Sequence, residues 1–188
     1  MKCVSLPGSE LESDFAGLVT EQSGVDINRC YQCLTCTLSC PSVFAMDHYP
    51  HQLVRLVQLG AKKEVLQSAT IWVCASCETC VTRCPNEIDI PRLMDTLRQM
   101  AIREGVPGKE KTAPVYHRVF LKSVRQRGKP YELGMLIELK LRTRDFFSDL
   151  GMGIKMLLKG KLSLLPGRIK GYREISDIFR RSVKGRDR

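Results

Sequence analysis

Two runs of cysteines in this 188-residue chain share one spacing that could bind metal. Both follow the pattern Cys-x2-Cys-x2-Cys-x3-Cys-Pro, and every position of the first run recurs 44 residues later. The eight cysteines are Cys30, Cys33, Cys36 and Cys40, then Cys74, Cys77, Cys80 and Cys84. Because the cysteine thiolate is a strong ligand for iron and zinc, the repeat predicts two metal-bound groups in one chain.

The spacing is typical of a ferredoxin-type 4Fe–4S cluster. Three cysteines at intervals of three residues can meet three corners of a cube from one short loop, and the fourth must come from elsewhere. In two-cluster ferredoxins the last cysteine of each run ligates the other cluster. On that rule the first cluster is held by Cys30, Cys33, Cys36 and Cys84, and the second by Cys74, Cys77, Cys80 and Cys40. The crossing predicts two neighbouring clusters, close enough for electrons to pass between them.

Three other uses of the cysteines fit less well. Zinc sites are built from two cysteine pairs, which leaves Cys36 and Cys80 unexplained. Disulfides are disfavoured because four cysteines crowd into eleven residues and the N-terminus does not resemble a secretory signal. A catalytic cluster with an open iron corner would lack a ligand, whereas both quartets are complete. Two fully ligated clusters are the favoured interpretation, and Cys3 is interpreted as a free thiol.

Helices rather than strands are predicted to position the cluster loops. Pro50 is suited to the first turn of a helix that ends at Gly60, and a second helix from about Lys62 to Val73 delivers Cys74. A third follows Pro91, with apolar residues at helical intervals. Small bacterial ferredoxins have short strands in these places, so a helical ferredoxin-type domain is the better prediction. Further helices are expected over Phe15–Gln22, Tyr116–Gln126, Glu132–Asp149 and Glu174–Arg181.

The predicted fold class is mainly α: an α-helical ferredoxin-type domain with two 4Fe–4S clusters, followed by a basic helical C-terminal extension. We place an N-terminal extension at residues 1–24, the cluster domain at 25–104 and the basic extension at 105–188. Residues 1–104 carry nine Lys and Arg against twelve Asp and Glu, whereas residues 105–188 carry 21 against 8. This asymmetry predicts a docking surface for an acidic protein, nucleic acid or membrane lipid, or else a solvated basic face.

The cellular compartment follows from two features of the sequence. No window of 18 or more apolar residues occurs, so a membrane-spanning segment is not expected. Cluster-binding thiolates and the lack of an export signal predict a reducing cytoplasm.

The histidines and two arginines near the runs receive structural interpretations. His48 and His51 flank Pro50 at a helix start, where local hydrogen bonding is expected rather than metal ligation. Arg29 and Arg83 each precede a predicted ligand and could raise a cluster potential by their charge. We expect both to be solvated surface residues. No residue of the chain is predicted to be catalytic.

The segments that flank the cysteine runs narrow the family. They are Cys30-Tyr31-Gln32-Cys33, Cys40-Pro41 with Phe44-Ala45-Met46-Asp47, Leu56-Val57-Gln58-Leu59-Gly60, Ile71-Trp72-Val73-Cys74-Ala75-Ser76-Cys77, and Arg83-Cys84-Pro85 with Ile88-Asp89-Ile90-Pro91. With these flanks, residues 25–104 resemble the small iron–sulfur C-type subunit of heterodisulfide reductase. The twin runs alone are shared with iron–sulfur subunits of fumarate reductase and glycolate oxidase type. The Trp-x-Cys-Ala-Ser-Cys and Ile-Asp-Ile-Pro flanks favour the heterodisulfide reductase family.

The resemblance implies a small electron-transfer subunit of an oxidoreductase complex, with two 4Fe–4S clusters. In that family the subunit lies between a flavin- and cluster-containing subunit and a catalytic subunit whose cysteine-rich motifs cleave a disulfide. The catalytic Cys-Cys-Gly-type motif is absent from this chain. The chain is therefore expected to relay single electrons within a hetero-oligomer and not to bind the disulfide itself.

Two alternatives differ in the partner that the chain would meet. One is an iron–sulfur subunit of a membrane-associated complex that reacts with quinone. The other is a nucleic-acid-binding protein with structural clusters, which the charge of residues 105–188 would suit. Sparse aromatic residues in that part of the chain give bases little surface to stack on, which disfavours nucleic acid.

Overall fold

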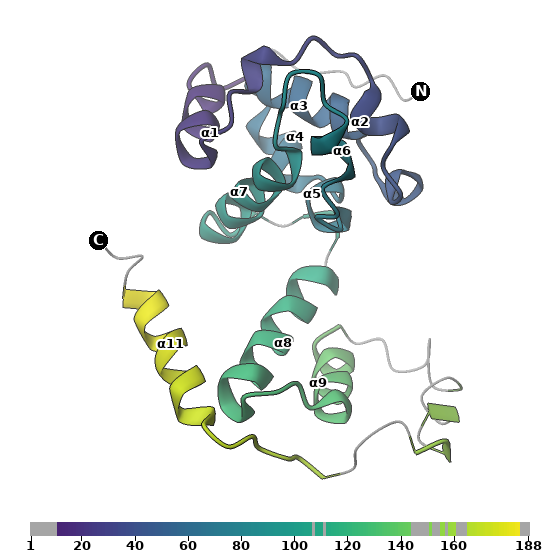
Figure 1. Ribbon diagram of the computed structural model, residues 1–188, viewed down its shortest axis with the longest axis vertical. Coiled ribbons are helices and arrows are strands. Elements are labelled where there is room, and N and C mark those ends of the chain that lie inside the picture. Colours follow the sequence, from purple (N-terminus) through teal and green to yellow (C-terminus); the bar gives the residue numbers. More distant parts are fainter. Residues whose placement is uncertain are drawn as a thin grey trace. The chain divides into compact units, whose positions relative to one another are not determined.

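The computed structural model is helical, and no strand occurs among the residues that it describes (Figure 1). The described residues are 11–106, 108–110, 112–143, 151, 155–156, 158–160 and 165–184. They confirm the prediction of a mainly α fold, and Cys3 lies outside them. The chain divides into two compact units, Met1–Glu110 and Lys111–Arg188. No helix within the described ranges has both the length and the apolar character that a membrane crossing needs.

The first unit consists of short helices arranged around the cysteine runs. Its longer helices are α1 (Phe15–Ser23), α3 (Pro50–Gln58), α4 (Lys62–Gln67) and α7 (Ile90–Arg103). Single helical turns complete it: η2 (Ile27–Arg29), α2 (Thr35–Leu38), η3 (Val43–Ala45), α5 (Thr70–Val73) and α6 (Thr79–Thr82). The turns η2 and α5 end just before the first cysteine of each run, and α2 and α6 lie inside the runs.

The core of the first unit is formed by the apolar faces of α1, α3 and α7. Helix α1 packs against both of the other two (Figure 1). The fully buried side chains on these faces include Phe15, Val19, Leu53, Val57, Leu93 and Leu97. Burial of one large apolar side chain contributes about 1.5–3 kcal/mol, so this cluster is a main source of stability. Five cysteines of the two runs pack against it, and the core thus forms the wall behind the thiols.

The boundaries of α3 follow from local chemistry. Pro50 opens the helix at a position where a missing N–H leaves no hydrogen bond unmade. The backbone N–H of Tyr49 donates to the Gln52 side chain over 3.0 Å and so fixes the first turn. After the helix, Gly60 has a φ of 75°, and a Cβ at this position would lie 2.3 Å from the carbonyl oxygen of Glu12. Only glycine permits this close approach of the segment before α1.

The prediction of one helix from Lys62 to Val73 is wrong, because the helix breaks between α4 and α5. Ser68 is extended, with a ψ of 138°, and its hydroxyl donates to Oδ1 of Asp47 over 2.6 Å. The same carboxylate oxygen accepts the backbone N–H and the hydroxyl of Thr70, at 3.0 and 2.9 Å. Serine and threonine hydroxyls compete with helical hydrogen bonds when another acceptor is near. Asp47 supplies that acceptor, and the chain is redirected before Cys74.

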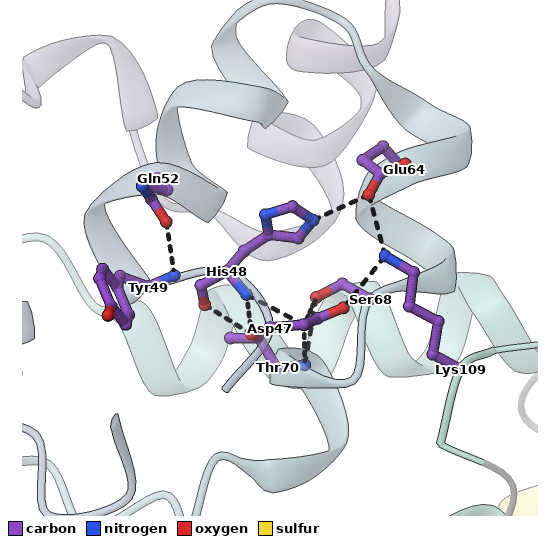
Figure 2. A network of polar contacts seen from close by, with 8 residues as sticks. All are labelled: Asp47, His48, Tyr49, Gln52, Glu64, Ser68, Thr70 and Lys109. Atoms are coloured by element: carbon purple, nitrogen blue, oxygen red, sulfur yellow. Dashed lines mark hydrogen bonds and ion pairs between the residues drawn. The ribbon is translucent and has the colours of Figure 1, made fainter. Parts of the chain in front are cut away.

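Figure 2 shows that Asp47 belongs to a larger polar network. Nε2 of His48 lies 2.8 Å from Oε1 of Glu64, and Nζ of Lys109 lies 3.0 Å from the same oxygen. Lys109 also pairs with Oδ2 of Asp47 over 3.3 Å. Burial opposes ionisation of Asp47, but the hydrogen bonds from Ser68, Ala69 and Thr70 outweigh it and hold the pKa of this carboxyl well below its usual range. The network therefore joins the loop after the first run to the turn before the second.

The second unit contains three described helices with few buried side chains. They are α8 (Thr112–Arg127), α9 (Glu132–Thr143) and α11 (Tyr172–Lys184). Helix α8 packs against both α9 and α11. Val119 of α8 and Met135 of α9 are buried between polar side chains, and Glu138 pairs with Lys122 over 2.8 Å across the two helices. Ion pairs thus supplement a small apolar contact.

Most helices lie where the sequence predicted them. The predictions over Phe15–Gln22 and after Pro91 are confirmed by α1 and α7. Helices α8 and α11 contain the predicted ranges and extend beyond them at both ends. The helix predicted over Glu132–Asp149 is helical through Thr143, and residues 144–149 lie outside the described ones.

Replacement of Asp47 by Ala should destabilise the first unit. Ser68 and Thr70 are fully buried, and their hydroxyls would lose the acceptor that Asp47 provides. Since a buried group without a partner costs about 1–3 kcal/mol, we expect the free energy of unfolding to fall by about 3 kcal/mol. Anaerobic denaturation followed by circular dichroism measures this difference.

The pH dependence of this effect has a defined sign. Asp47 has a lowered pKa in the folded chain, so its contribution is present above the ordinary Asp pKa of about 3.9 and is lost as the pH falls through the folded value. The deficit of Asp47→Ala should be constant near neutral pH and shrink in acid. Asp14→Ala is a matched control, because the Asp14 side chain makes no capping hydrogen bond. Equal losses in the two variants would contradict the role given to Asp47.

Candidate iron–sulfur site

Each cysteine run folds as a loop that passes twice through left-handed backbone conformation. The φ angles are 62° at Gln32 and 67° at Leu34, and 50° and 61° at the equivalent Ser76 and Glu78. This conformation costs a residue other than glycine roughly 1–2 kcal/mol. The same strain occurs at the same places in both runs, which points to a loop shape that the site requires. One turn of helix, α2 or α6, follows in each run and carries the third cysteine.

A hollow of about 330 Å³ lies against the first run. It is lined by all four thiols predicted to bind the first cluster, namely Cys30, Cys33, Cys36 and Cys84. The remaining wall is largely apolar and includes Val54, Ile88 and Ile90. The fold therefore brings the last cysteine of the second run to the first three cysteines of the first run.

A second hollow, of about 380 Å³, lies against the second run. It is lined by the other predicted quartet, Cys40, Cys74, Cys77 and Cys80, together with Cys36. Burial raises the pKa of Cys40, and the neighbouring thiols of the second run add to this rise. Both predicted quartets are thus brought together by the fold, each with one thiol from the opposite run.

The two hollows share part of their walls. Cys36 and Ile90 line both of them, and helix α2 packs against α6. The thiol of Cys80 is also close enough to Cys36 for their charges to interact. Groups held in these hollows would therefore be neighbours.

Buried and exposed thiols follow the same order in both runs. Burial raises the pKa of Cys36 to about 11 and that of Cys80 to about 12. In contrast, a hydrogen bond with the following threonine hydroxyl lowers the pKa of Cys33 and of Cys77. A cysteine must lose its proton to bind a metal, so a bound cation is what would keep the two buried thiols ionised.

The first hollow has two hydrogen-bond donors to sulfur that the sequence did not reveal. The Gln32 side chain donates to Sγ of Cys30 over 3.3 Å, and the backbone N–H of Ile88 donates to Sγ of Cys84 over 3.4 Å. Such donors tune the potential of a cluster. Sequence reasoning missed Gln32, because cysteine spacing does not show where the intervening side chains point.

Two further side chains were missed, and both bind the backbone just before a run. Gln58 of α3 donates to the carbonyl oxygen of Ile27, and Arg98 of α7 donates to that of Ile71. The carbonyl acceptors lie one repeat length apart in the sequence. No local motif identifies these donors, because each contact joins residues that are far apart along the chain.

The histidines and exposed arginines lie where the sequence placed them. His51 lines the first hollow, and its Nδ1 lies 2.7 Å from the hydroxyl of Thr37; burial lowers the pKa of this histidine. His48 bonds Glu64 in the network of Figure 2. Arg29 and Arg83 are exposed. Each histidine is thus hydrogen-bonded, as expected at this helix start, although the partner of His48 comes from α4.

The donor set of each hollow fits a 4Fe–4S cube. All eight cysteines of the runs are free of disulfides. The thiols of each quartet surround a hollow, and within the described part of the chain no three Cys, His, Asp or Glu side chains converge like the ligands of a single ion. A cube presents one iron at each of four corners, and four thiols around an apolar hollow suit that shape.

Comparison with known proteins agrees with this donor set. Residues 26–88, which include all eight cysteines, match the family model described as a 4Fe-4S dicluster domain. This part of the chain is a 4Fe–4S dicluster domain. The domain accounts for two 4Fe–4S clusters, as the cysteine repeat predicted.

Curated relatives of the dicluster domain carry related names, all of them C-type subunits of a heterodisulfide reductase. The chain is 36% identical over 89 residues to the CoB–CoM heterodisulfide reductase iron-sulfur protein of this type from Methanopyrus kandleri, which covers 47% of the chain and 46% of that protein. It is 43% identical over 79 residues to a counterpart in the same reductase from Methanocaldococcus jannaschii, 42% of each. For the counterpart in the ferredoxin:CoB–CoM heterodisulfide reductase of Methanosarcina acetivorans, the identity is 43% over 86 residues, 46% of the chain and 34% of that protein. The aligned part spans about half the length, or less, of these relatives.

Serine substitutions provide a test of the crossed ligands. If Cys84 binds the first cluster of the dicluster domain, Cys84→Ser and Cys33→Ser should alter the same EPR signal, since both would change one cube. Cys40→Ser and Cys77→Ser should together alter the other signal. Iron and sulfide analysis of each anaerobically purified variant shows whether both clusters are retained. A pairing of Cys84 with Cys77 in these spectra would show that the ligands are not crossed.

Proposed function

We propose that this chain is an electron-transfer subunit of a heterodisulfide reductase-type complex. In this role it relays single electrons between a flavin- and cluster-containing subunit and a catalytic, disulfide-reducing subunit. It has no catalytic residue of its own. The observation that carries the proposal is the pair of adjoining hollows, each lined by three thiols of one run and one thiol of the other.

The cysteines would hold one cube in each hollow. Cys30, Cys33, Cys36 and Cys84 are the proposed ligands of the first, and Cys74, Cys77, Cys80 and Cys40 those of the second. When bound, 4Fe–4S clusters accept and release one electron at a time. With four thiolates each, both cubes are fully ligated, which leaves no corner for a substrate and favours relay over catalysis.

The rest of the domain keeps the two sites close, rigid and dry. Ile90 lines both hollows, while Val54 and Met94 contribute apolar wall to the first and the second. The network around Asp47 fixes the segment after Cys40 relative to the turn before Cys74. A relay benefits from this rigidity, because the protein's part in such chemistry is to fix the position and surroundings of its cofactors.

The basic second unit offers a surface for an acidic partner subunit. An open hollow there is lined by Arg125, Arg127 and Arg168, with Gln126, Tyr172 and Ser176, and no acidic residue is part of its lining. The guanidinium groups of Arg127 and Arg168 lie over the rings of Tyr131 and Tyr172, at 5.3 and 5.1 Å from the ring centres. A concave surface lined by one sign of charge attracts the opposite charge and speeds association.

The composition of the anaerobically purified complex tests the proposed function. The chain should contain about eight irons and eight sulfides, as expected for two 4Fe–4S clusters. Proteins that co-purify with it from its native cells should include one with a flavin site and one with paired cysteine-rich motifs. A haem-bearing membrane protein in their place would favour the quinone-linked alternative, and stoichiometric zinc would contradict the proposal altogether.

Charge reversal in the arginine hollow should weaken binding of the partner subunit. The double variant Arg125→Glu, Arg168→Glu places two negative charges in the hollow, and we expect the affinity to fall by at least about tenfold, or 1.4 kcal/mol. Affinity measured at several salt concentrations should also depend less steeply on salt.

Arg118→Glu, together with Arg173→Glu, gives a control with the same change in net charge. Neither residue lines the hollow, although each lies on the same helix as a residue that does. An equal loss of affinity in the control would show that overall charge, and not this hollow, determines docking.

A further inference from the structure

The backbone before the two cysteine runs is held by different side chains at equivalent places. Ile27 and Cys30 correspond to Ile71 and Cys74, one repeat length later. Nε2 of Gln58 donates to the carbonyl oxygen of Ile27 over 2.8 Å and makes a longer contact of 3.5 Å with that of Cys30. In the second half, Nε of Arg98 donates to the carbonyl of Ile71, and its Nη2 donates to that of Cys74 over 2.5 Å.

The need for a donor is the same in both halves. The turns η2 and α5 end just before the first cysteine of each run, and the last carbonyls of such a short helix have no partner within it. A side chain from the helix that follows each run, α3 or α7, supplies the missing donors. An amide and a guanidinium can both do so, but only the guanidinium carries a charge.

The charge of Arg98 acts close to the second site. Its side chain is 15% exposed, and it donates to the peptide of Cys74, a proposed ligand. Asp95 pairs with Nη1 over 2.6 Å, but this carboxylate is 57% exposed, so solvent screens it more than it screens Arg98. Other charges near the runs are weaker candidates, since Arg29, Arg83 and Glu78 are all exposed.

We propose that Arg98 sets the reduction potential of the second cluster and holds it above the value that an amide at this position would give. The inference rests on the proposed function, because it assumes the ligands Cys40, Cys74, Cys77 and Cys80. Reduction adds negative charge, and a nearby fixed cation stabilises the reduced form more than the oxidised form. At the first cluster only neutral donors, Gln58 and Gln32 among them, take the corresponding places.

Potentiometric titration monitored by EPR tests the role of Arg98 in the full chain. Arg98→Gln reproduces the neutral donor of the first half, and Arg98→Lys keeps the charge. We expect Arg98→Gln to shift the reduction equilibrium of the second cluster about tenfold toward the oxidised form, which is about 59 mV for one electron. The first cluster should not change, and Arg98→Lys should retain most of the wild-type value. The signals are assigned with Cys33→Ser and Cys77→Ser.

Two results would overturn the inference. One is an Arg98→Gln protein with two intact clusters and unchanged potentials, and the other is an equal shift of both potentials, which indicates a general structural effect. If Arg98→Gln fails to load the second cluster, Gln58→Arg decides: it should raise the potential of the first cluster, and no change would refute the mechanism. Asp95→Asn should raise the potential of the second cluster.

Failure of the proposed function has a different signature. Wild-type protein would then contain fewer than two cubes by iron and sulfide analysis, whatever residue stands at position 98. The inference would fall with it, whereas unchanged potentials in a two-cluster protein would overturn only the role of Arg98.

Discussion

A cube with four metal corners cannot be enclosed by one tight loop, and the rest of the first unit can be understood from that constraint. Three thiols at intervals of three residues reach one side, so the fourth has to arrive from another segment. Here that segment is the matching run, and the exchange is mutual. Helices α2 and α6 must then lie together, and the residues between the runs must return the chain to its starting point. Helices α3, α4 and α5 perform this return while their apolar faces build the wall behind the thiols.

Features encoded by nearby residues could be predicted from the sequence. The two clusters follow from cysteine spacing, and helices α3 and α7 follow from Pro50, Pro91 and the apolar residues behind them. The crossed ligand assignment stays a prediction, although the hollows bring the expected thiols together. The left-handed residues of the loops could not be foreseen, since Gln32 or Glu78 has no intrinsic preference for that conformation.

Features that depend on distant partners escaped sequence reasoning. The break at Ser68 requires the carboxylate of Asp47, and nothing in the local sequence forbids a continuous helix. Gln58 and Arg98 look like ordinary polar residues on helix surfaces until the fold places two backbone carbonyls before them. The same holds for the second unit, where the sequence shows an excess of positive charge but not the grouping of Arg125, Arg127 and Arg168. The domain boundaries at 24 and 104 remain predictions.

The exchange of the fourth cysteine also makes each cluster a cross-link. A cube bound by Cys36 and Cys84 would close a loop of nearly fifty residues, and one bound by Cys40 and Cys74 would close a second loop nested inside it. By analogy with a disulfide, each closure removes chain entropy from the unfolded state worth about 4 kcal/mol. In a unit of this size, two such staples rival the apolar core. The lifetime of the inorganic clusters would then set the lifetime of the fold, and oxygen would act on this protein as a denaturant.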